Sequence, residues 1–138
     1  MASKLLIAAG ETAAAPEQVP ASVRALIDVA DEIMVVAPAL PSRWEWLSSA
    51  TDKASDHADE RLQAVLGHLG ELGADASGQV GADDPLVAIE DAVRSFDPDH
   101  ILVGLRAGER AGWQERGLLD AVLDSFGLPL TVFQFRDG

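Results

Sequence analysis

The stretch Asp99-His100-Ile101-Leu102-Val103-Gly104 is a short apolar run that begins with polar residues and ends at a glycine. Four other runs of similar length occur along the chain, and between them apolar residues recur at three- and four-residue spacing. Alternating strand and helix patterns of this kind predict a mostly parallel sheet with helices on both faces. The five expected strands are Lys4 to Ala9, Glu32 to Ala37, about Ala74 to Val80, His100 to Gly104 and Leu130 to Phe135.

Four helices are expected, one between each pair of successive strands. Their apolar residues form stripes that would be buried along one side of each helix. Gly73 and Gly127 fit the positions that follow a helix C-terminus, while Asp83 or Asp84 followed by Pro85 fits a helix start. The helices are expected over about 19–30, 51–72, 85–96 and 117–126.

The length of 138 residues fits one three-layer α/β domain that spans residues 1–138. Right-handed crossovers leave few strand orders, and the flavodoxin-like order 2-1-3-4-5 or a close variant of it is expected. Such sheets bind ligands at the carboxyl ends of the strands beside the point where the strand order reverses. We expect this point at the first and fourth strands, so a ligand site is sought in residues 10–12 and 104–110.

The composition excludes several classes of function. A net charge of -13 should repel nucleic acids and anionic lipid surfaces. The absence of cysteine excludes disulfides, thiolate metal sites and cysteine nucleophiles. The apolar residues form no run long enough to span a membrane, and the N-terminal residues do not resemble a signal peptide, so a cytoplasmic location is expected.

The histidines and tryptophans are further candidates for site residues. His57 and His68 lie about 16 Å apart along one expected helix and cannot share a metal ion, so no metal site is expected. His100 begins the fourth strand, at the end of the sheet opposite the ligand edge, and a structural hydrogen bond is expected there. Trp44 and Trp46 follow the second strand, where they either stack on a planar ligand, pack their loop onto the second helix or fill a subunit interface.

Known catalytic signatures are missing from the sequence. No P-loop lysine follows the glycines, no G-x-S-x-G elbow is present, and no G-x-G-x-x-G follows the first strand. The acidic residues that a response regulator needs at its strand ends are also missing, because Gly10 stands after the first strand and Val80 or Gly81 ends the third. No catalytic residue is therefore predicted.

Residues 99–104, the glycine-bearing loop after them, the helix that opens near Gly117 and the closing strand at 128–132 together resemble the universal stress protein family. The turn at 80–85 resembles the Gly-Asp-Pro turn that this family places before its third helix, with one residue added. Residues 37–43 and 115–117 resemble an actinobacterial branch of the family. The resemblance covers nearly the whole chain through the order and spacing of its elements. It implies an adenine nucleotide alpha hydrolase-like fold and a role in stress response or regulation.

ATP-binding members of that family carry the motif G-x2-G-x9-G-(S/T), in which glycines let backbone N–H groups approach the phosphates. In this chain Gly104 matches the first glycine and Gly117 the third, whereas Ala107 replaces the second glycine and Leu118 replaces the hydroxyl residue. The motif is therefore degenerate, and the resemblance implies a weakened nucleotide site.

The resemblance also implies further residues of the same site. The family's aspartate after the first strand falls at Gly10, with Glu11 adjacent to it, and the end of the second strand brings in Ala37. In the loop after the fourth strand, Gly108 together with Gly112 would re-form a phosphate-binding nest, or these glycines only give the loop the freedom to connect a strand to a helix. Arg106 and Arg110 either supply positive charge to that nest or are exposed loop residues.

Two functions therefore remain open from the sequence. The first is a non-catalytic stress-response or regulatory domain that binds adenine nucleotide weakly or not at all. The second is an ATP-binding universal stress protein that hydrolyses ATP slowly through Arg106, Glu109 and Arg110. No cofactor is required by the first, and ATP or AMP with Mg²⁺ is implied by the second.

A homodimer is expected through the strand at Leu130 to Phe135. This strand should form an edge of the sheet, and it is apolar and nearly free of the charges that usually protect sheet edges. Members of the universal stress protein family commonly dimerise through this strand, so the resemblance implies the same partner. The alternative is a monomer kept apart by its net charge of -13.

Overall fold

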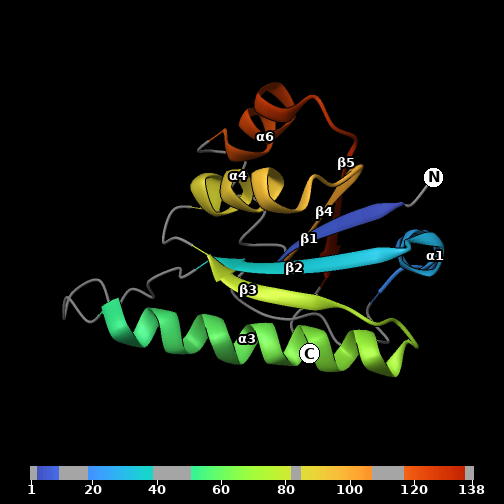
Figure 1. Ribbon diagram of the computed structural model, residues 1–138, viewed down its shortest axis with the longest axis horizontal. Coiled ribbons are helices and arrows are strands. Elements are labelled where there is room, and N and C mark those ends of the chain that lie inside the picture. Colours follow the sequence, from blue (N-terminus) through green and yellow to red (C-terminus); the bar gives the residue numbers. More distant parts are fainter. Residues whose placement is uncertain (1–2, 10–18, 39–50, 82–84, 107–116, 136–138) are drawn as a thin grey trace.

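The computed structural model describes residues 3–9, 19–38, 51–81, 85–106 and 117–135. In these ranges five parallel strands form one sheet, and helices cover both of its faces (Figure 1). The elements in chain order are β1 (Lys4–Ala9), α1 (Ala21–Val29), β2 (Glu32–Pro38), α3 (Thr51–Glu71), β3 (Ser77–Gly81), α4 (Pro85–Phe96), β4 (His100–Arg106), α6 (Leu118–Phe126) and β5 (Leu130–Phe135). The predicted α/β fold class is confirmed.

The strand order differs from the flavodoxin-like order. The sheet runs β3-β2-β1-β4-β5, so of the two expected possibilities the close variant is found and the order 2-1-3-4-5 is not. The reason is that α1 and α3 lie on the same face, so two successive right-handed crossovers carry the chain outward in one direction, first to β2 and then to β3. The chain then returns through α4 on the other face, which places β4 beside β1. The reversal between β1 and β4 is where the sequence predicted it.

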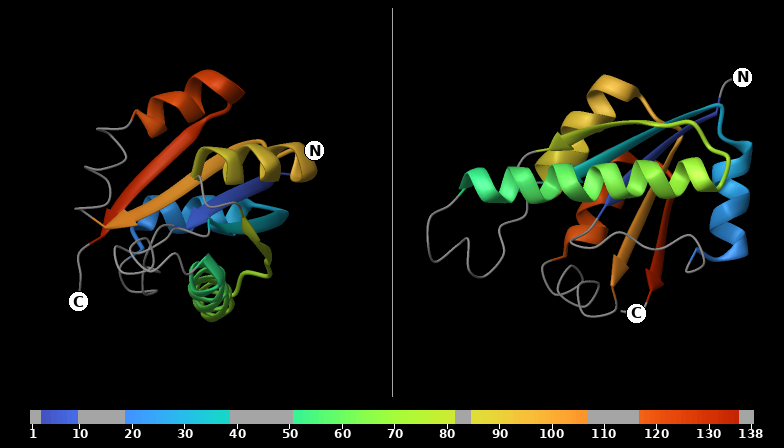
Figure 2. Two further views of the ribbon diagram at one scale, coloured as in Figure 1. Left: turned by 90° about the vertical axis from the view of Figure 1, so that its left-hand side faces the viewer. Right: turned by 90° about the horizontal axis from the view of Figure 1, so that it is seen from below.

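The two faces of the sheet follow the alternation of side chains along each strand. On β1, Leu5 and Ile7 pack on the face that α1 and α3 cover, while Leu6 and Ala8 pack on the face that α4 and α6 cover. Figure 2 shows the sheet between these two helix layers. Because β1 is central and buried on both faces, every one of its residues from Leu5 to Ala9 is buried. The sheet is therefore a rigid platform that fixes the positions of its strand ends.

The third strand is shorter than expected. It begins at Ser77 instead of Ala74, because only Ser77 to Gly81 lie opposite β2 residues and pair with them. Its place at the edge of the sheet and its partly exposed residues are as predicted. The bounds of β1 and β5 agree with the sequence prediction, while β2 and β4 extend slightly further.

The predicted helix ends are confirmed where the structure describes them. Gly127 has a φ of +60° and donates its N–H to the carbonyl of Leu123 at 3.1 Å, which is the left-handed cap that favours glycine. Gly73 also has a positive φ and follows α3. The expected cap at Asp83 or Asp84 lies outside the described residues. No helix in the described part of the chain is both long and apolar enough to cross a membrane.

Candidate functional site

The carboxyl ends of β1 and β4 meet at the reversal of the strand order, where a parallel α/β sheet binds its ligands. Ala9 on β1 is the register partner of Gly104 on β4, and Gly104 is in turn the partner of Phe133 on β5. Ala37, near the end of β2, is fully buried. Ala9 is also buried, whereas Gly104 is partly exposed. Of the expected site residues, the structure thus brings Ala37 and Gly104 to one edge of the sheet.

Packing against Phe133 requires a glycine at position 104. A Cβ atom on Gly104 would lie 2.7 Å from both Cε1 and Cζ of Phe133, which is too close for a real contact. The Phe133 ring therefore occupies the space beside the backbone of β4. Gly104 matches the first glycine of the nucleotide-binding motif. Its packing against Phe133 explains the glycine without any ligand.

Gly117 directly precedes α6 with a φ of +68°, a conformation that favours glycine. Because α6 returns antiparallel to β4, its N-terminus lies at the carboxyl edge of the sheet, where its free N–H groups favour an anion. For Arg106 and Leu118 the structure describes the backbone alone. The other predicted candidates lie outside the described residues: Gly10, Glu11, Trp44, Trp46, Ala107, Gly108, Glu109, Arg110 and Gly112.

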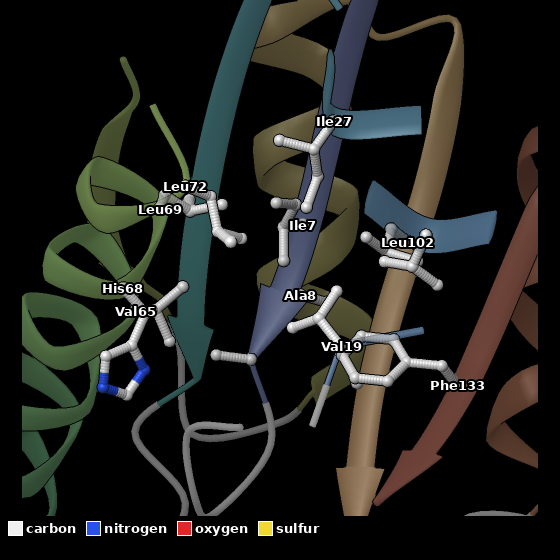
Figure 3. A pocket seen from close by; sticks show the side chains of 13 residues that line it. Ile7, Ala8, Val19, Ile27, Val65, His68, Leu69, Leu72, Leu102 and Phe133 are labelled. Carbon is white, nitrogen blue, oxygen red and sulfur yellow. The ribbon is translucent and has the colours of Figure 1, made fainter. Parts of the chain in front are cut away.

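An apolar hollow lies beneath these strand ends, on the face covered by α1 and α3. We call it the α1/α3 hollow; its cavity volume is about 60 Å³. Figure 3 shows the Phe133 ring beside Val19 and His68 beside Val65. Its lining residues are Ile7, Ala8, Ala9, Val19, Val23, Ile27, Val65, His68, Leu69, Leu72, Leu102, Gly104 and Phe133.

The sequence analysis did not find this hollow. Its lining comes from α1, α3 and three strands, so no single segment carries a pattern for it. The register of β1, β4 and β5 could have indicated the hollow. It places Phe133 beside Gly104, and the small residues Ala9 and Gly104 leave room next to the Phe133 ring. That register depends on the strand order, which the sequence pattern alone did not settle.

His100 lies at the other end of the sheet, at the start of β4. Its Nε2 atom lies 2.8 Å from Oγ1 of Thr131 on β5, so the predicted structural hydrogen bond is confirmed. Burial lowers the pKa of His100, because a partly desolvated imidazole favours its neutral form. His100 therefore joins two strands and is not part of the candidate site.

The described residues contain no group of three or more His, Cys, Asp or Glu side chains placed to hold a metal ion. Three charged side chains near the amino ends of the strands form hydrogen bonds with backbone atoms. Asp99 Oδ2 accepts the N–H of Lys4 at 2.9 Å, and Asp31 Oδ2 accepts the N–H of Ser3 at 2.7 Å. The Lys4 ammonium donates to the Phe96 carbonyl at 3.2 Å.

Comparison with known proteins gives structural similarity only. No family model and no curated protein sequence matches this chain significantly. The universal stress protein from Archaeoglobus fulgidus, solved in complex with dAMP, superposes with a TM-score of 0.67 at 16% identity, covering 94% of this chain and 96% of that one. A universal stress protein family protein from Arabidopsis thaliana with AMP bound gives a TM-score of 0.59 at 14% identity, covering 99% and 93%. This chain therefore has the fold of the universal stress proteins.

Proposed function

We propose that this chain is a non-catalytic regulatory domain of the universal stress type, which binds an adenine nucleotide weakly at the carboxyl ends of β1 and β4. The observation that carries the proposal is the register pair Ala9 and Gly104 at the reversal of the strand order. Parallel α/β sheets bind their ligands beside such a reversal. Two solved structures that share the fold hold dAMP and AMP.

The affinity should be low because the phosphate loop departs from the motif of ATP-binding members. Ala107 adds a methyl group where that motif has glycine, and Leu118 removes a hydroxyl donor. Each lost hydrogen bond costs on the order of 1 kcal/mol or more. The obstructing methyl group and the lost hydrogen bond together weaken binding by up to about two powers of ten. A nucleoside monophosphate makes fewer phosphate contacts than ATP, so AMP should lose less affinity.

We also propose that the domain has no catalytic role, because its described strand-end residues carry no reactive side chain. Ala9, Ala37 and Gly104 carry no group that can accept or donate a proton, and none of them can act as a nucleophile. The competing function is slow ATP hydrolysis, and it would depend on Arg106, Glu109 and Arg110 in the loop after β4.

A titration with AMP, followed by NMR, tests where the nucleotide binds. We expect the amide signals of Ala9 and Gly104 to shift, while that of the exposed Val29 on α1 stays unchanged. Shifts confined to residues away from the strand ends would contradict the proposed site. Phosphate release from ATP should not exceed that in buffer, and release that Arg110→Ala abolishes would favour the hydrolytic function.

We further propose a homodimer through β5 in the cytoplasm. The strand lies at an edge of the sheet, where its outer backbone groups have no partner strand in the described part of the chain. Phe133 packs against the hydrophobic core on the α1/α3 face, so pairing of two copies would be carried mainly by the backbone of the strand.

A further inference from the structure

We infer that the α1/α3 hollow is a binding site for a small uncharged apolar group, and that Phe133 sets the size of the group it accepts. The inference goes beyond the proposed nucleotide site, because it needs neither a phosphate contact nor a ribose contact. It rests on the chemistry of the lining, on the volume of the hollow and on the contact between Phe133 and Gly104.

The lining selects against charged and strongly polar ligands. His68 carries the only polar side chain among the described residues that line the hollow. A polar or ionic group placed there would lose its hydration without finding enough hydrogen-bond partners. Filling the hollow with an apolar group gives its walls contacts that they otherwise lack.

The volume limits the ligand. A dry apolar cavity of about 150 Å³ accommodates benzene or xenon. The hollow has about 60 Å³, so a short branched alkyl group or a single large atom fits more readily than an aromatic ring. Three of its walls are fixed, because Ile7, Ile27 and Leu102 are buried parts of the core.

Phe133 is the wall that determines this limit. It lies on the edge strand β5, it is only partly buried, and its ring fills the space that Gly104 leaves beside β4. Figure 3 shows the ring turned toward Val19 on the opposite wall. Removing this ring would join its volume to the existing cavity and make room for one planar apolar ring.

The α1/α3 hollow overlaps the proposed nucleotide site at Ala9 and Gly104, whereas Ala37 is not among its lining residues. Ile7 and Leu102 line the hollow and are not residues of the proposed nucleotide site. Signals from these two residues therefore report binding of an apolar probe separately from nucleotide binding.

The first experiment exposes the unmodified chain to xenon under pressure and records methyl NMR spectra. We expect the methyl signals of Ile7 and Leu102 to shift in a saturable manner, while those of the exposed Val87 and Leu123 do not. Equal small shifts at all four residues would show non-specific solvation and would overturn the inference.

The second experiment tests the role of Phe133 with benzene. The Phe133→Ala variant should gain at least about 2 °C in Tm at saturating benzene, whereas the native chain and the surface control Leu123→Ala should not. Adding Val65→Phe, which refills the enlarged space, should abolish the gain. If Phe133→Ala does not fold, Phe133→Leu replaces it with a smaller expected gain. No gain in a folded variant, or an equal gain in the native chain, would overturn the inference.

A parallel titration with AMP separates this inference from the proposed function. If AMP does not bind but the xenon and benzene responses are observed, only the proposed nucleotide site is contradicted. Retained AMP binding without those responses would remove only the apolar site.

Discussion

Gly104 on β4 and Phe133 on β5 are register partners, and their packing leaves no room for a side chain at position 104. The absence of a Cβ atom at Gly104 lets the Phe133 ring lie against the backbone of β4. This pair joins the strand-end site to the α1/α3 hollow, because both residues line the hollow and Gly104 is also the register partner of Ala9 at the end of β1.

The first prediction concerns this contact. Gly104→Ala should lower the free energy of unfolding by about 1–3 kcal/mol, because the added methyl group overpacks against the ring. Phe133→Leu in the same chain should recover part of the loss. Urea denaturation of the single and double variants measures the coupling between the two positions.

The matched control is Gly67→Ala on α3. A Cβ atom at Gly67 meets nothing within 4 Å, and alanine favours a helix interior, so this variant should gain about 0.5–1 kcal/mol. Equal stability of Gly104→Ala and the native chain would show that the ring does not occupy the space beside Gly104.

The second prediction concerns pH. Burial lowers the pKa of His100 in the folded chain below the value of 6.5 that it has when unfolded. The unfolded chain therefore binds more protons as the pH falls through 6.5, and the contribution of neutral His100 to stability is present above that pH and is lost below it. The urea midpoint should decrease between pH 7.5 and pH 5.5, and less steeply in His100→Gln. An unchanged slope in the variant would assign the pH dependence to other groups.

The third prediction restores the family motif. The double variant Ala107→Gly, Leu118→Ser should bind ATP more tightly than the native chain, by up to about two powers of ten, because it regains close backbone approach and one hydroxyl donor. Calorimetric dissociation constants for the two proteins measure the ratio. If the variant binds no better, the loop is not the limiting defect, and Gly10→Asp is the next variant to compare.

The fourth prediction concerns assembly. Light scattering at physiological salt should give twice the chain mass of 14.5 kDa, because β5 offers an open apolar edge. Val132→Lys should give a monomer, and its free energy of unfolding should also fall, because Val132 packs against the core on the α4/α6 face. Leu123→Lys on the exposed side of α6 should remain a dimer. A native monomer at high micromolar concentration would contradict the dimer.

Local patterns predicted most of the fold. The strands at 4–9 and 130–135 were placed from their apolar residues, and Gly73 and Gly127 marked helix ends, because a left-handed cap leaves a signal at a single position. The meeting of the first and fourth strands was also predicted, since it follows from the alternation of elements and the handedness of crossovers.

Features that depend on distant segments were not predictable in the same way. The strand order depends on which face of the sheet receives each helix, and the apolar stripe of α3 fits either face. The α1/α3 hollow depends on the register of Phe133 with Gly104, which exists only once β5 pairs with β4. Of the predicted site residues, Ala37 and Gly104 lie near the carboxyl ends of their strands, and their role in a site stays a prediction. The loop residues after β4 rest on the sequence resemblance.

Calorimetric titration of the native chain with AMP and with ATP in the presence of Mg²⁺ tests the central claim most directly. The account predicts measurable but weak binding at one site per chain, with dissociation constants above about 10 μM and no phosphate release from ATP. A dissociation constant for ATP below about 10 μM, or no heat from either nucleotide at millimolar concentration, would contradict it.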